Sequence, residues 1–384
     1  MGTLKVDTIQ DSGGNTILSS DGSGGFTNSL PAGKSGSFRN IVINGDMSIA
    51  QRGTSQASIT STGYYTLDRF RFVDSSLGTF TMSQDTDVPT GQGFAKSLKV
   101  DCTTADAAPS GGDVLQIQQR FEGQNLQYLK KGTSNAESLT LSFWVKSNKI
   151  GTYICELRDI DNSRSISKSY TIDASNTWEK KTITFAGDTT GTLVNDNNVS
   201  FDIQFWLGSG TTYTSGTLQT SWDSTVNANR AVGQVNLADS TSNEWYVTGV
   251  QLEAGTSASD FEFLPTDVNL QRCYRYFESY TYTDSFDPIH NSYNRNNNDA
   301  HFVFQYKTTK RAKPSVSISA GSTFRVNTFT NGDADASGSN VFRIGNNAVE
   351  IEIQRTSSAI TGGEASFIGC ASGQTAFIKL DSEL

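Results

Sequence analysis

The sequence predicts an all-β protein built from two antiparallel, jelly-roll-like β-sandwiches that a short helix joins. Short runs of alternating apolar and polar residues recur along the 384 residues, and turns rich in Gly, Asn, Asp and Ser separate them. The composition agrees with this pattern, because 35 glycines, 6 prolines and 18% charged residues are typical of turn-rich β-proteins with hydroxyl-rich outer faces. No internal repeat with a period of roughly 20–50 residues indicates a solenoid or a propeller.

Residues 245–280 divide the chain, because they begin as a strand, pass a Gly/Ser/Asp turn and reach a predicted helix just after Pro265. Either Thr266 or Asp267 can cap the start of this helix. Its apolar face follows the spacing i, i+3, i+4 and i+7 and comprises Leu270, Cys273, Tyr274 and Phe277. The predicted parts are an extended N-terminal segment (1–37), a first sandwich (38–265) and the helix with a second sandwich (266–384).

The N-terminal segment carries one short strand-like stretch and several turn signals, which is too little apolar sequence to bury a core. A terminal segment without a core becomes ordered where something holds it. We therefore expect a partner surface for this segment, either another copy of this chain or a larger assembly.

The first sandwich is predicted to contain about eight or nine short strands. The clearest is SLTLSFWVKS (residues 138–147), in which every second residue from Leu139 to Val145 is apolar. The stretch FRNIVINGDMSIAQRGT (residues 38–54) predicts two strands around an Asn44–Gly45 turn. Because strands from distant parts of the sequence pair in such sandwiches, the last strand should lie beside an early one.

Residues 208–243 predict a long polar loop, and long ordered loops are often functional. Aromatic rings can stack on the apolar face of a sugar, so Trp222 and Tyr213 in this loop are candidate ligand contacts. Trp144 and Trp206 point away from the apolar sides of their strands. We expect that face either to be open to a sugar or to be covered by a neighbouring subunit or by the loop.

The second sandwich is predicted to have about five to seven strands with Asn-Gly and Gly-Asn turns. Near its start, residues 280–298 form a predicted loop that is dense in Tyr and Asn, a composition typical of adaptable recognition loops. The candidate ligand contacts in this loop are Tyr280, Tyr282, Tyr293 and Asn294. The alternative is a polar loop at a subunit boundary.

The formal net charge of -9 and the pI of about 4.9 argue against a nucleic-acid partner, which requires a basic surface. The one basic cluster, residues 307–313, is short and predicts a solvated strand end. No apolar run reaches the length of about 18 residues that a membrane span needs, so we expect no membrane insertion. Cys102, Cys155 and Cys273 lie in apolar patterns and are expected in the core.

We expect no enzymatic activity. The chain has two histidines, His290 and His301, and no G-x-S-x-G motif surrounds a serine that either could activate. The 39 acidic residues form many pairs by chance, so they do not indicate a glycosidase. DADASGS, from Asp333, imitates the start of an EF-hand loop, but its twelfth position is Ile344 instead of Glu. We therefore predict neither catalytic residues nor a cofactor.

NIVINGDMSIAQRGT with YYTLDRFRF opens the predicted first sandwich, and GVQLEAGTSASDFEF with LQRCYRYFE lies at its end. The first pair resembles the opening, and the second pair the end, of the carbohydrate-binding-module-like sandwich of bacteriophage tail-fibre and receptor-binding proteins. FVFQYKTTKRAKPSVSIS and the closing LDSEL resemble the strand pair that follows and the usual C-terminus. LKVDTIQDSGGNTI resembles the N-terminal segment of marine-phage fibre and appendage proteins. The middle of the chain, about 75–240, is assigned by strand pattern alone.

This resemblance implies a virion component that is commonly a homotrimer and that contacts host surface glycans with its outer domains. It implies that the N-terminal segment docks on other phage tail or virion proteins, with Leu4, Val6 and Ile9 as apolar contacts. In sugar-binding sandwiches of this kind a structural calcium ion often joins the first strand to the last. Asp46 and Glu253 stand where the resemblance would place its ligands.

We therefore expect a phage tail fibre, located in the virion, that attaches the particle to host surface polysaccharide or lipopolysaccharide by non-catalytic binding. One alternative is a capsid fibre, decoration protein or tail adaptor without a receptor role. Another is a carbohydrate-binding module of a secreted glycan-degrading enzyme. We disfavour the latter, because we expect neither a signal peptide nor a catalytic domain.

Overall fold

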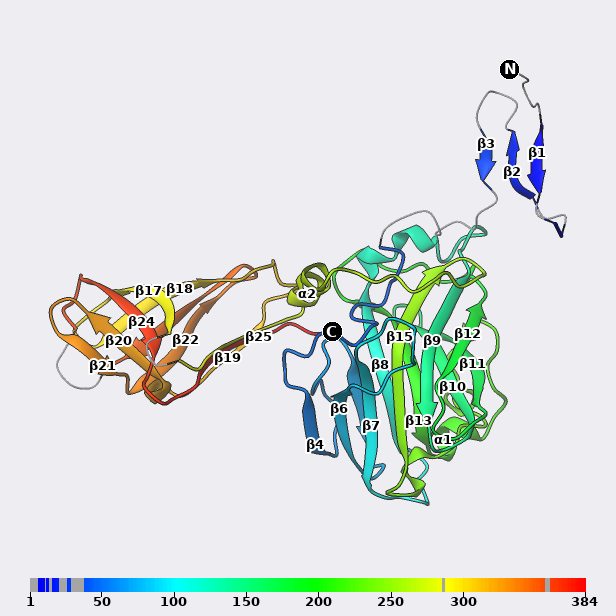
Figure 1. Ribbon diagram of the computed structural model, residues 1–384, viewed down its shortest axis with the longest axis horizontal. Coiled ribbons are helices and arrows are strands. Elements are labelled where there is room, and N and C mark those ends of the chain that lie inside the picture. Colours follow the sequence, from blue (N-terminus) through cyan, green and yellow to red (C-terminus); the bar gives the residue numbers. More distant parts are fainter. Residues whose placement is uncertain are drawn as a thin grey trace.

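The computed structural model describes residues 6–10, 12–13, 16–20, 26–28, 38–284, 287–355 and 360–384. They form a small N-terminal sheet, a large first sandwich and a smaller second sandwich, with helix α2 (Thr266–Tyr274) between the two sandwiches (Figure 1). The prediction of two antiparallel β-sandwiches joined by a short helix is confirmed. Within the described residues, no helix is long and apolar enough to cross a membrane.

The N-terminal sheet is antiparallel, with the order β1-β2-β3. It comprises β1 (Thr8–Gln10), β2 (Thr16–Ser20) and β3 (Phe26–Asn28). Only one of these strands is expected from the sequence. All three residues of β1 are exposed, including Ile9, and Val6 just before the strand is also exposed.

The first sandwich consists of two six-stranded antiparallel sheets. The covered sheet, over which the loop 208–243 lies, comprises in order β14 (Asp223–Ser224), β11 (Arg164–Ile172), β10 (Gly151–Asp159), β13 (Val199–Ser209), β8 (Val114–Glu122) and β5 (Arg71–Ser75). The groove sheet, named after a groove on its outer face, comprises in order β12 (Glu179–Phe185), β9 (Leu139–Ser147), β15 (Glu244–Ala254), β7 (Ser97–Thr104), β6 (Thr79–Asp85) and β4 (Ser55–Ile59).

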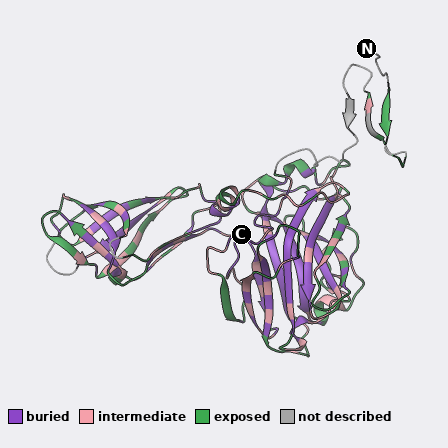
Figure 2. Cartoon of the chain, in the orientation of Figure 1, coloured by how far each residue is buried: buried purple, intermediate pink, exposed green. Residues whose placement is uncertain are grey.

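The core of this sandwich lies between the two sheets. Phe143 of β9 meets Phe205 of β13 edge-to-face with 5.2 Å between ring centroids, and Trp245 of β15 lies 5.9 Å from Phe205. All three side chains are buried, and Figure 2 shows buried residues along the central strands. Strand β15 lies between β7 and β9, which confirms that the last strand pairs with an earlier one.

The stretch predicted as two strands around Asn44 and Gly45 is instead irregular and largely buried, and β4 begins only at Ser55. The Asn44 side chain explains the difference, because its Nδ2 donates to the carbonyls of Ile49 and Asp68 at 2.9 and 3.0 Å. Its Oδ1 accepts the N–H of Ile49 at 2.9 Å, and its φ is 61°. Side-chain hydrogen bonds thus take the place of a strand ladder.

Helix α2 begins after Pro265 as predicted, but Pro265 itself occupies the N-cap position and no described side chain caps the first turn. The prediction that Thr266 or Asp267 caps the helix is therefore wrong. Phe277 also lies outside the helix, because it opens the next strand. The helix packs on the first sandwich in a buried cluster of Ile43, Ile49, Cys273 and Tyr276, with Leu270 and Leu384 alongside.

The second sandwich contains ten described strands, three in one sheet and seven in the other, against about five to seven predicted from turn signals. The smaller sheet comprises in order β16 (Phe277–Tyr282), β25 (Ala376–Asp381) and β19 (Ser315–Ile318). The larger comprises in order β21 (Gly332–Asp335), β20 (Phe324–Thr328), β24 (Ala365–Cys370), β17 (Pro288–Asn294), β18 (Asp299–Gln305), β23 (Ala348–Gln354) and β22 (Gly338–Ile344). The sequence-based prediction misses short hairpins, because their strands span only four to seven residues.

Short helices occupy several connections. They are η1 (Gly123–Asn125), η2 (Gln127–Leu129), α1 (Thr211–Thr214), η3 (Asn227–Asn229), η4 (Leu237–Asp239) and η5 (Gly321–Thr323). All four cysteines are buried and unpaired, which confirms the core positions predicted for three of them.

The C-terminal residues return to the first sandwich and fasten the second sandwich to it. Glu383 forms ion pairs with Arg52 and Arg69 of the first sandwich. The hydroxyl of Tyr64 donates to the carbonyl oxygen of Leu384 at 2.9 Å. Arg69 and Glu383 are both largely buried, so breaking this contact would leave a charge without a partner.

The basic cluster at residues 307–313 belongs to this same interface. Lys310 is fully buried and forms an ion pair with the buried Glu278. Arg311 donates through Nη1 to the carbonyl of Asn197 in the first sandwich at 3.1 Å. The prediction of a solvated strand end is therefore wrong, because Glu278 supplies a counter-charge from a strand that the local sequence does not reveal.

Candidate functional site

The ligand contacts predicted at residues 280–298 do not lie in one loop. Tyr280 and Tyr282 belong to β16, whereas Tyr293 and Asn294 belong to β17. Alternating Tyr and Thr residues favour a strand, and β16 pairs along its whole length with β25. The Tyr- and Asn-rich composition predicts a loop, because composition carries no information about pairing with a distant strand.

The surroundings of these four residues also differ. The Tyr280 ring packs edge-to-face on Phe304 at 4.8 Å, and burial together with Glu278 raises the pKa of its hydroxyl. Asn294 is buried and donates to the carbonyl of Thr361 at 3.0 Å, so it is not a surface contact. Tyr293 is exposed. The predicted set therefore does not form a single binding surface.

The loop 208–243 covers its sheet instead of projecting from it. The Tyr213 ring lies 5.3 Å from that of Trp206, which is fully buried, so the loop does cover Trp206. Trp222 packs 6.0 Å from Phe201 and donates through Nε1 to the carbonyl of Ala186 at 2.7 Å. Both predicted contacts are thus half-buried packing residues.

A buried ion pair pins this loop to the covered sheet. Arg230 in the loop donates through Nε to Glu156 Oε1 of β10 at 2.9 Å. The indole N–H of Trp206 donates to Glu156 Oε2 at 3.0 Å, and Arg230 Nη2 also reaches Gln204 Oε1 at 2.9 Å. These contacts satisfy the buried carboxylate and leave little room for a ligand.

The groove sheet offers a different surface. On its outer face Trp144 of β9 is half-buried, between Lys180 of β12 and Thr248 of β15. A groove of about 300 Å³ opens over this ring. Its aromatic lining comprises Phe94, Trp144, Phe261 and Phe263, and its polar lining comprises Gln92, Ser142, Lys180 and Asp260.

The aromatic wall of this groove depends on a glycine. Phe94 packs 5.1 Å from Phe261 and 5.0 Å from Phe263, and Phe263 itself is half exposed. Gly249 has a φ of 61° at a bulge in β15, and a Cβ atom there would lie 2.5 Å from the Phe94 ring. The bulge therefore admits the Phe94 ring, which any other residue at this position would displace.

A second aromatic group continues the same face. The ammonium of Lys146 lies 4.1 Å from the centre of the Tyr246 ring and forms an ion pair with Asp87. Trp178 donates through Nε1 to Asp87 Oδ1 at 2.8 Å, and its ring lies 6.1 Å from that of Tyr246. These contacts hold the segment beside the groove in place, so the groove is a built feature of the sheet.

The sequence indicated Trp144 but not its partners. Phe261 and Phe263 alternate with acidic residues in DFEF directly after the last strand, and this pattern is the signal that could have revealed them. Nothing near Phe94 in the sequence indicates that it meets them, because the contact depends on the bulge at Gly249.

The two predicted calcium ligands have separate partners. Asp46 Oδ1 accepts from Asn269 Nδ2 at 3.0 Å and from the Ser48 hydroxyl at 3.1 Å. Glu253 accepts from the N–H and the hydroxyl of Ser259, both at 2.7 Å. Hydrogen-bond donors thus surround these carboxylates, and the described residues hold no cluster of three or more His, Cys, Asp or Glu side chains. The calcium ion stays a prediction.

Of the predicted attachment residues, Leu4 lies outside the described residues. Val6 and Ile9 are about half exposed, at 51% and 47%. Their role in attachment also stays a prediction.

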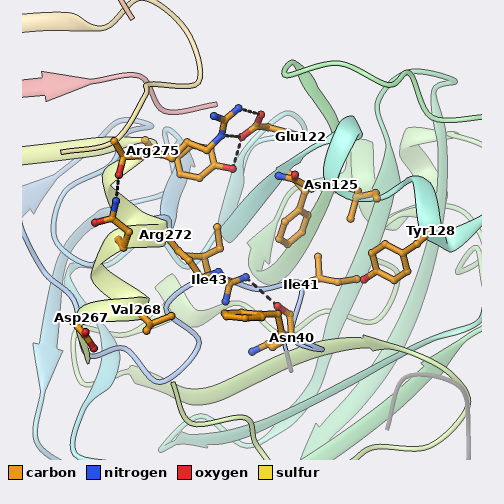
Figure 3. Close-up of a pocket in the computed structure, with 16 residues that line it drawn as sticks. Asn40, Ile41, Ile43, Glu122, Asn125, Tyr128, Asp267, Val268, Arg272 and Arg275 are labelled. Atoms are coloured by element: carbon orange, nitrogen blue, oxygen red, sulfur yellow. Dashed lines mark hydrogen bonds and ion pairs between the residues drawn. The ribbon is translucent and has the colours of Figure 1, made fainter. Parts of the chain in front are cut away.

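A larger pocket of about 750 Å³ lies at the seam between the first sandwich and helix α2 (Figure 3). Ile41 and Ile43 approach it from the first sandwich, and Val268 and Arg272 approach it from the helix. None of the predicted ligand contacts lines it.

No protein-family model matches the sequence, and no curated protein matches it. Among solved structures, the chain is similar to the enzymatically active domain of tailspike protein 4 of bacteriophage CBA120, with 13% identity and a TM-score of 0.30. That match covers 56% of this chain and 21% of the tailspike chain.

Two further solved structures are similar over the same share of this chain. A putative sugar-binding protein from Bacteroides thetaiotaomicron has 10% identity and a TM-score of 0.31 over 56% of this chain and 99% of its own. TmCBM61 in complex with β-1,4-galactotriose has 9% identity and a TM-score of 0.29, with the same two coverages. With such TM-scores the likenesses assign neither a fold nor a function.

Proposed function

We propose that this protein binds glycans without catalysis and serves as a tail fibre that attaches a bacteriophage to its host. The observation that carries the proposal is the groove over Trp144, which combines a row of aromatic rings with Gln, Ser, Lys and Asp side chains. Sugars present an apolar face and a hydroxyl-rich edge, and such a mixed lining matches both. The groove has a volume of only about 300 Å³, so it suits weak contact with one or two sugar units.

Weak single sites suit a multivalent particle. If three copies of this chain form a homotrimer on the virion, several grooves can contact one polysaccharide, and avidity replaces single-site affinity. The resemblance of the sequence to tail-fibre proteins supports the assignment to a phage virion. The exposed Val6 and Ile9 support attachment through the N-terminal segment.

The non-catalytic part of the proposal has support from both histidines. His301 is fully buried, with its ring nitrogens 3.0 and 3.2 Å from carboxylate oxygens of Glu350 and Glu352. His290 stacks on Phe302 at 5.2 Å. Both positions lie in the second sandwich, away from the groove over Trp144.

An array of bacterial surface polysaccharides tests the proposal. We expect the purified chain to bind a subset of these glycans, and Trp144→Ala to lower the affinity by about tenfold or more, since buried aromatic rings dominate such contacts. Tyr293→Ala is the matched control, because Tyr293 is an exposed aromatic residue on the other sandwich. Loss of binding in Tyr293→Ala alone would move the site to the second sandwich. Absence of any glycan binding would reject the function.

A structural role in the virion is a second candidate, as a capsid fibre, decoration protein or tail adaptor. The seam pocket favours it, because exposed Phe38 and Tyr128 at its rim suit contact with another protein. Electron microscopy of virions with an antibody against residues 266–384 separates the two roles. Label at a distal tail tip supports receptor binding, and label on the capsid or tail neck supports the structural role.

A further inference from the structure

The seam pocket is apolar along its walls and basic at one point. Its apolar lining includes Ile41, Ile43, Phe121, Leu126 and Val268. A volume of about 750 Å³ lies within the range of roughly 300–1,000 Å³ that is typical of ligand sites. Figure 3 shows the guanidinium of Arg272 reaching from helix α2 toward Asn40, among the residues that line the pocket.

Of the two arginines that line the pocket, Arg275 forms an ion pair with Glu122, whereas Arg272 has no carboxylate partner among the described residues. Its Nη2 donates to the carbonyl of Asn40 at 3.1 Å, and within the described residues no carboxylate lies within ion-pair distance of it. Burial lowers the pKa of this guanidinium. A half-buried guanidinium with a single neutral partner gains from any anion that enters the pocket.

The acidic residues nearby are already engaged. Glu122 accepts from Arg275 Nε at 2.7 Å and from the Tyr276 hydroxyl at 2.6 Å. Glu262 accepts the backbone N–H groups of Phe38 and Asn40 at 2.6 and 3.0 Å. Neither carboxylate can turn to Arg272 without losing these bonds.

Asp267, on the first turn of the helix, is the remaining acid that lines the pocket. Figure 3 shows its carboxylate directed away from Arg272. The pocket therefore presents, among apolar walls, one guanidinium, that of Arg272, without a carboxylate partner in the described part of the chain.

The rim of the pocket indicates the size of its occupant. Phe38 and Tyr128 expose 60% and 51% of their surface, and both line the pocket. A small ligand would fill the interior but leave these rings in water. A protein segment would cover them as well, and Tyr, Phe and Arg are side chains that carry much of the binding energy in protein interfaces.

We propose that the seam pocket binds a segment of a partner protein that inserts a large apolar side chain next to a carboxylate. The apolar side chain fills the space between the isoleucines and Val268, and the carboxylate pairs with Arg272. This proposal does not rest on glycan binding, because the groove over Trp144 shares no lining residue with the pocket.

Two short peptides test this chemistry. The probes are acetyl-Gly-Phe-Asp-Gly-amide and its matched neutral partner acetyl-Gly-Phe-Asn-Gly-amide, and the readout is the methyl NMR spectrum of Ile-, Leu- and Val-labelled full-length chain. We expect the Asp peptide to shift the methyl signals of Ile41, Ile43 and Val268. We expect it to bind about fivefold more tightly than the Asn peptide, because a charge-assisted hydrogen bond is the stronger.

Two variants locate the effect. Arg272→Gln should bind both peptides equally, whereas Tyr128→Ser, at an exposed rim position, should weaken both by a similar factor and keep the preference for Asp. Arg343→Gln is the control, because its side chain is 82% exposed on the second sandwich. Thermal melting of each variant shows that it is folded.

Four results would overturn the proposal. The first is the absence of methyl shifts in the pocket, and the second is equal binding of the two peptides by the wild-type chain. The third is a shift of the same methyl signals by a neutral galacto-oligosaccharide, which would make the pocket a sugar site. The fourth is a change of oligomeric state in Arg272→Gln or Tyr128→Ser, measured by light scattering, which would make the occupant a second copy of this chain.

Discussion

The two sandwiches of this protein close their outer faces in different ways. In the first, the loop 208–243 lies over the covered sheet and buries a polar layer that includes Glu156, Asp202 and Arg230. In the second, apolar side chains such as Val303 and Phe329 remain exposed on strands and at a hairpin. The covered sheet of the first sandwich thus gains stability from satisfied polar groups outside the core, and the larger sheet of the second sandwich keeps surface that another molecule could cover.

This difference teaches where each sandwich is vulnerable. A buried polar layer is stable only while every member has its partner, so removal of one member is costly. An exposed apolar side chain has little contact to lose, so its removal has a small effect on stability. The predictions that follow test these two statements, beginning with the larger effect.

The largest effect is expected from Arg230→Ala in the first sandwich. Among the described side chains, this change leaves the fully buried Glu156 with the indole N–H of Trp206 as its one hydrogen-bond partner. Loss of one member of a buried ion pair costs about 3–5 kcal/mol, and we expect urea unfolding to show a loss of that order.

The control for this prediction comes from the second sandwich. Arg343 forms an ion pair with Glu350, but its side chain is 82% exposed. Surface pairs contribute about 1 kcal/mol or less, so Arg343→Ala should change the free energy of unfolding very little. Equal effects of the two substitutions would show that the polar layer under the loop is open to water.

The sequence predicts the cores of both sandwiches better than it predicts their polar layers. Alternation in SLTLSFWVKS places Leu141 and Phe143 in the core, because apolar side chains at every second position of a strand can share one face. The position of Arg230 in the middle of a long polar loop gives no hint that it reaches Glu156, 74 residues earlier. Such contacts depend on the path of the loop, which local patterns do not determine.

The same reasoning explains the outcome at the candidate site. The sequence identifies Trp144 as a candidate contact, because it is a large aromatic residue on the polar face of a strand whose other face is apolar. The prediction of a loop at the Tyr- and Asn-rich stretch is wrong, because Tyr280 and its neighbours form a strand by pairing with β25, almost 100 residues later. The seam pocket was not predictable, since Arg272 and Ile41 come together only when helix α2 docks on the first sandwich.

A smaller effect, which depends on pH, is expected at Asp202 in the same polar layer. Burial raises the pKa of this carboxyl to about 6, from an ordinary value of 3.8. The folded protein therefore binds a proton more tightly than the unfolded chain, and the free energy of unfolding falls as the pH rises from about 4 to 6. A difference of about two pKa units corresponds to about 3 kcal/mol.

Unfolding of Asp202→Asn between pH 4 and 7 tests this sign. The variant should lose less stability than the wild-type chain as the pH rises, because it has no carboxylate to ionise there. Asp68, whose pKa burial also raises to about 6, is present in both proteins, so its contribution cancels in the difference. Parallel pH profiles of the two proteins would contradict the prediction.

The smallest effect is expected at Phe329, at the tip of the β20–β21 hairpin in the second sandwich. Its side chain is fully exposed, so Phe329→Ser removes no buried surface and should change the free energy of unfolding by less than about 0.5 kcal/mol. Urea unfolding combined with light scattering measures both stability and association. A loss of more than about 1 kcal/mol, together with a smaller particle, would mean that another copy of the chain covers this ring in solution. The second sandwich would then close this surface by association, whereas the covered sheet of the first is closed by a loop of the same chain.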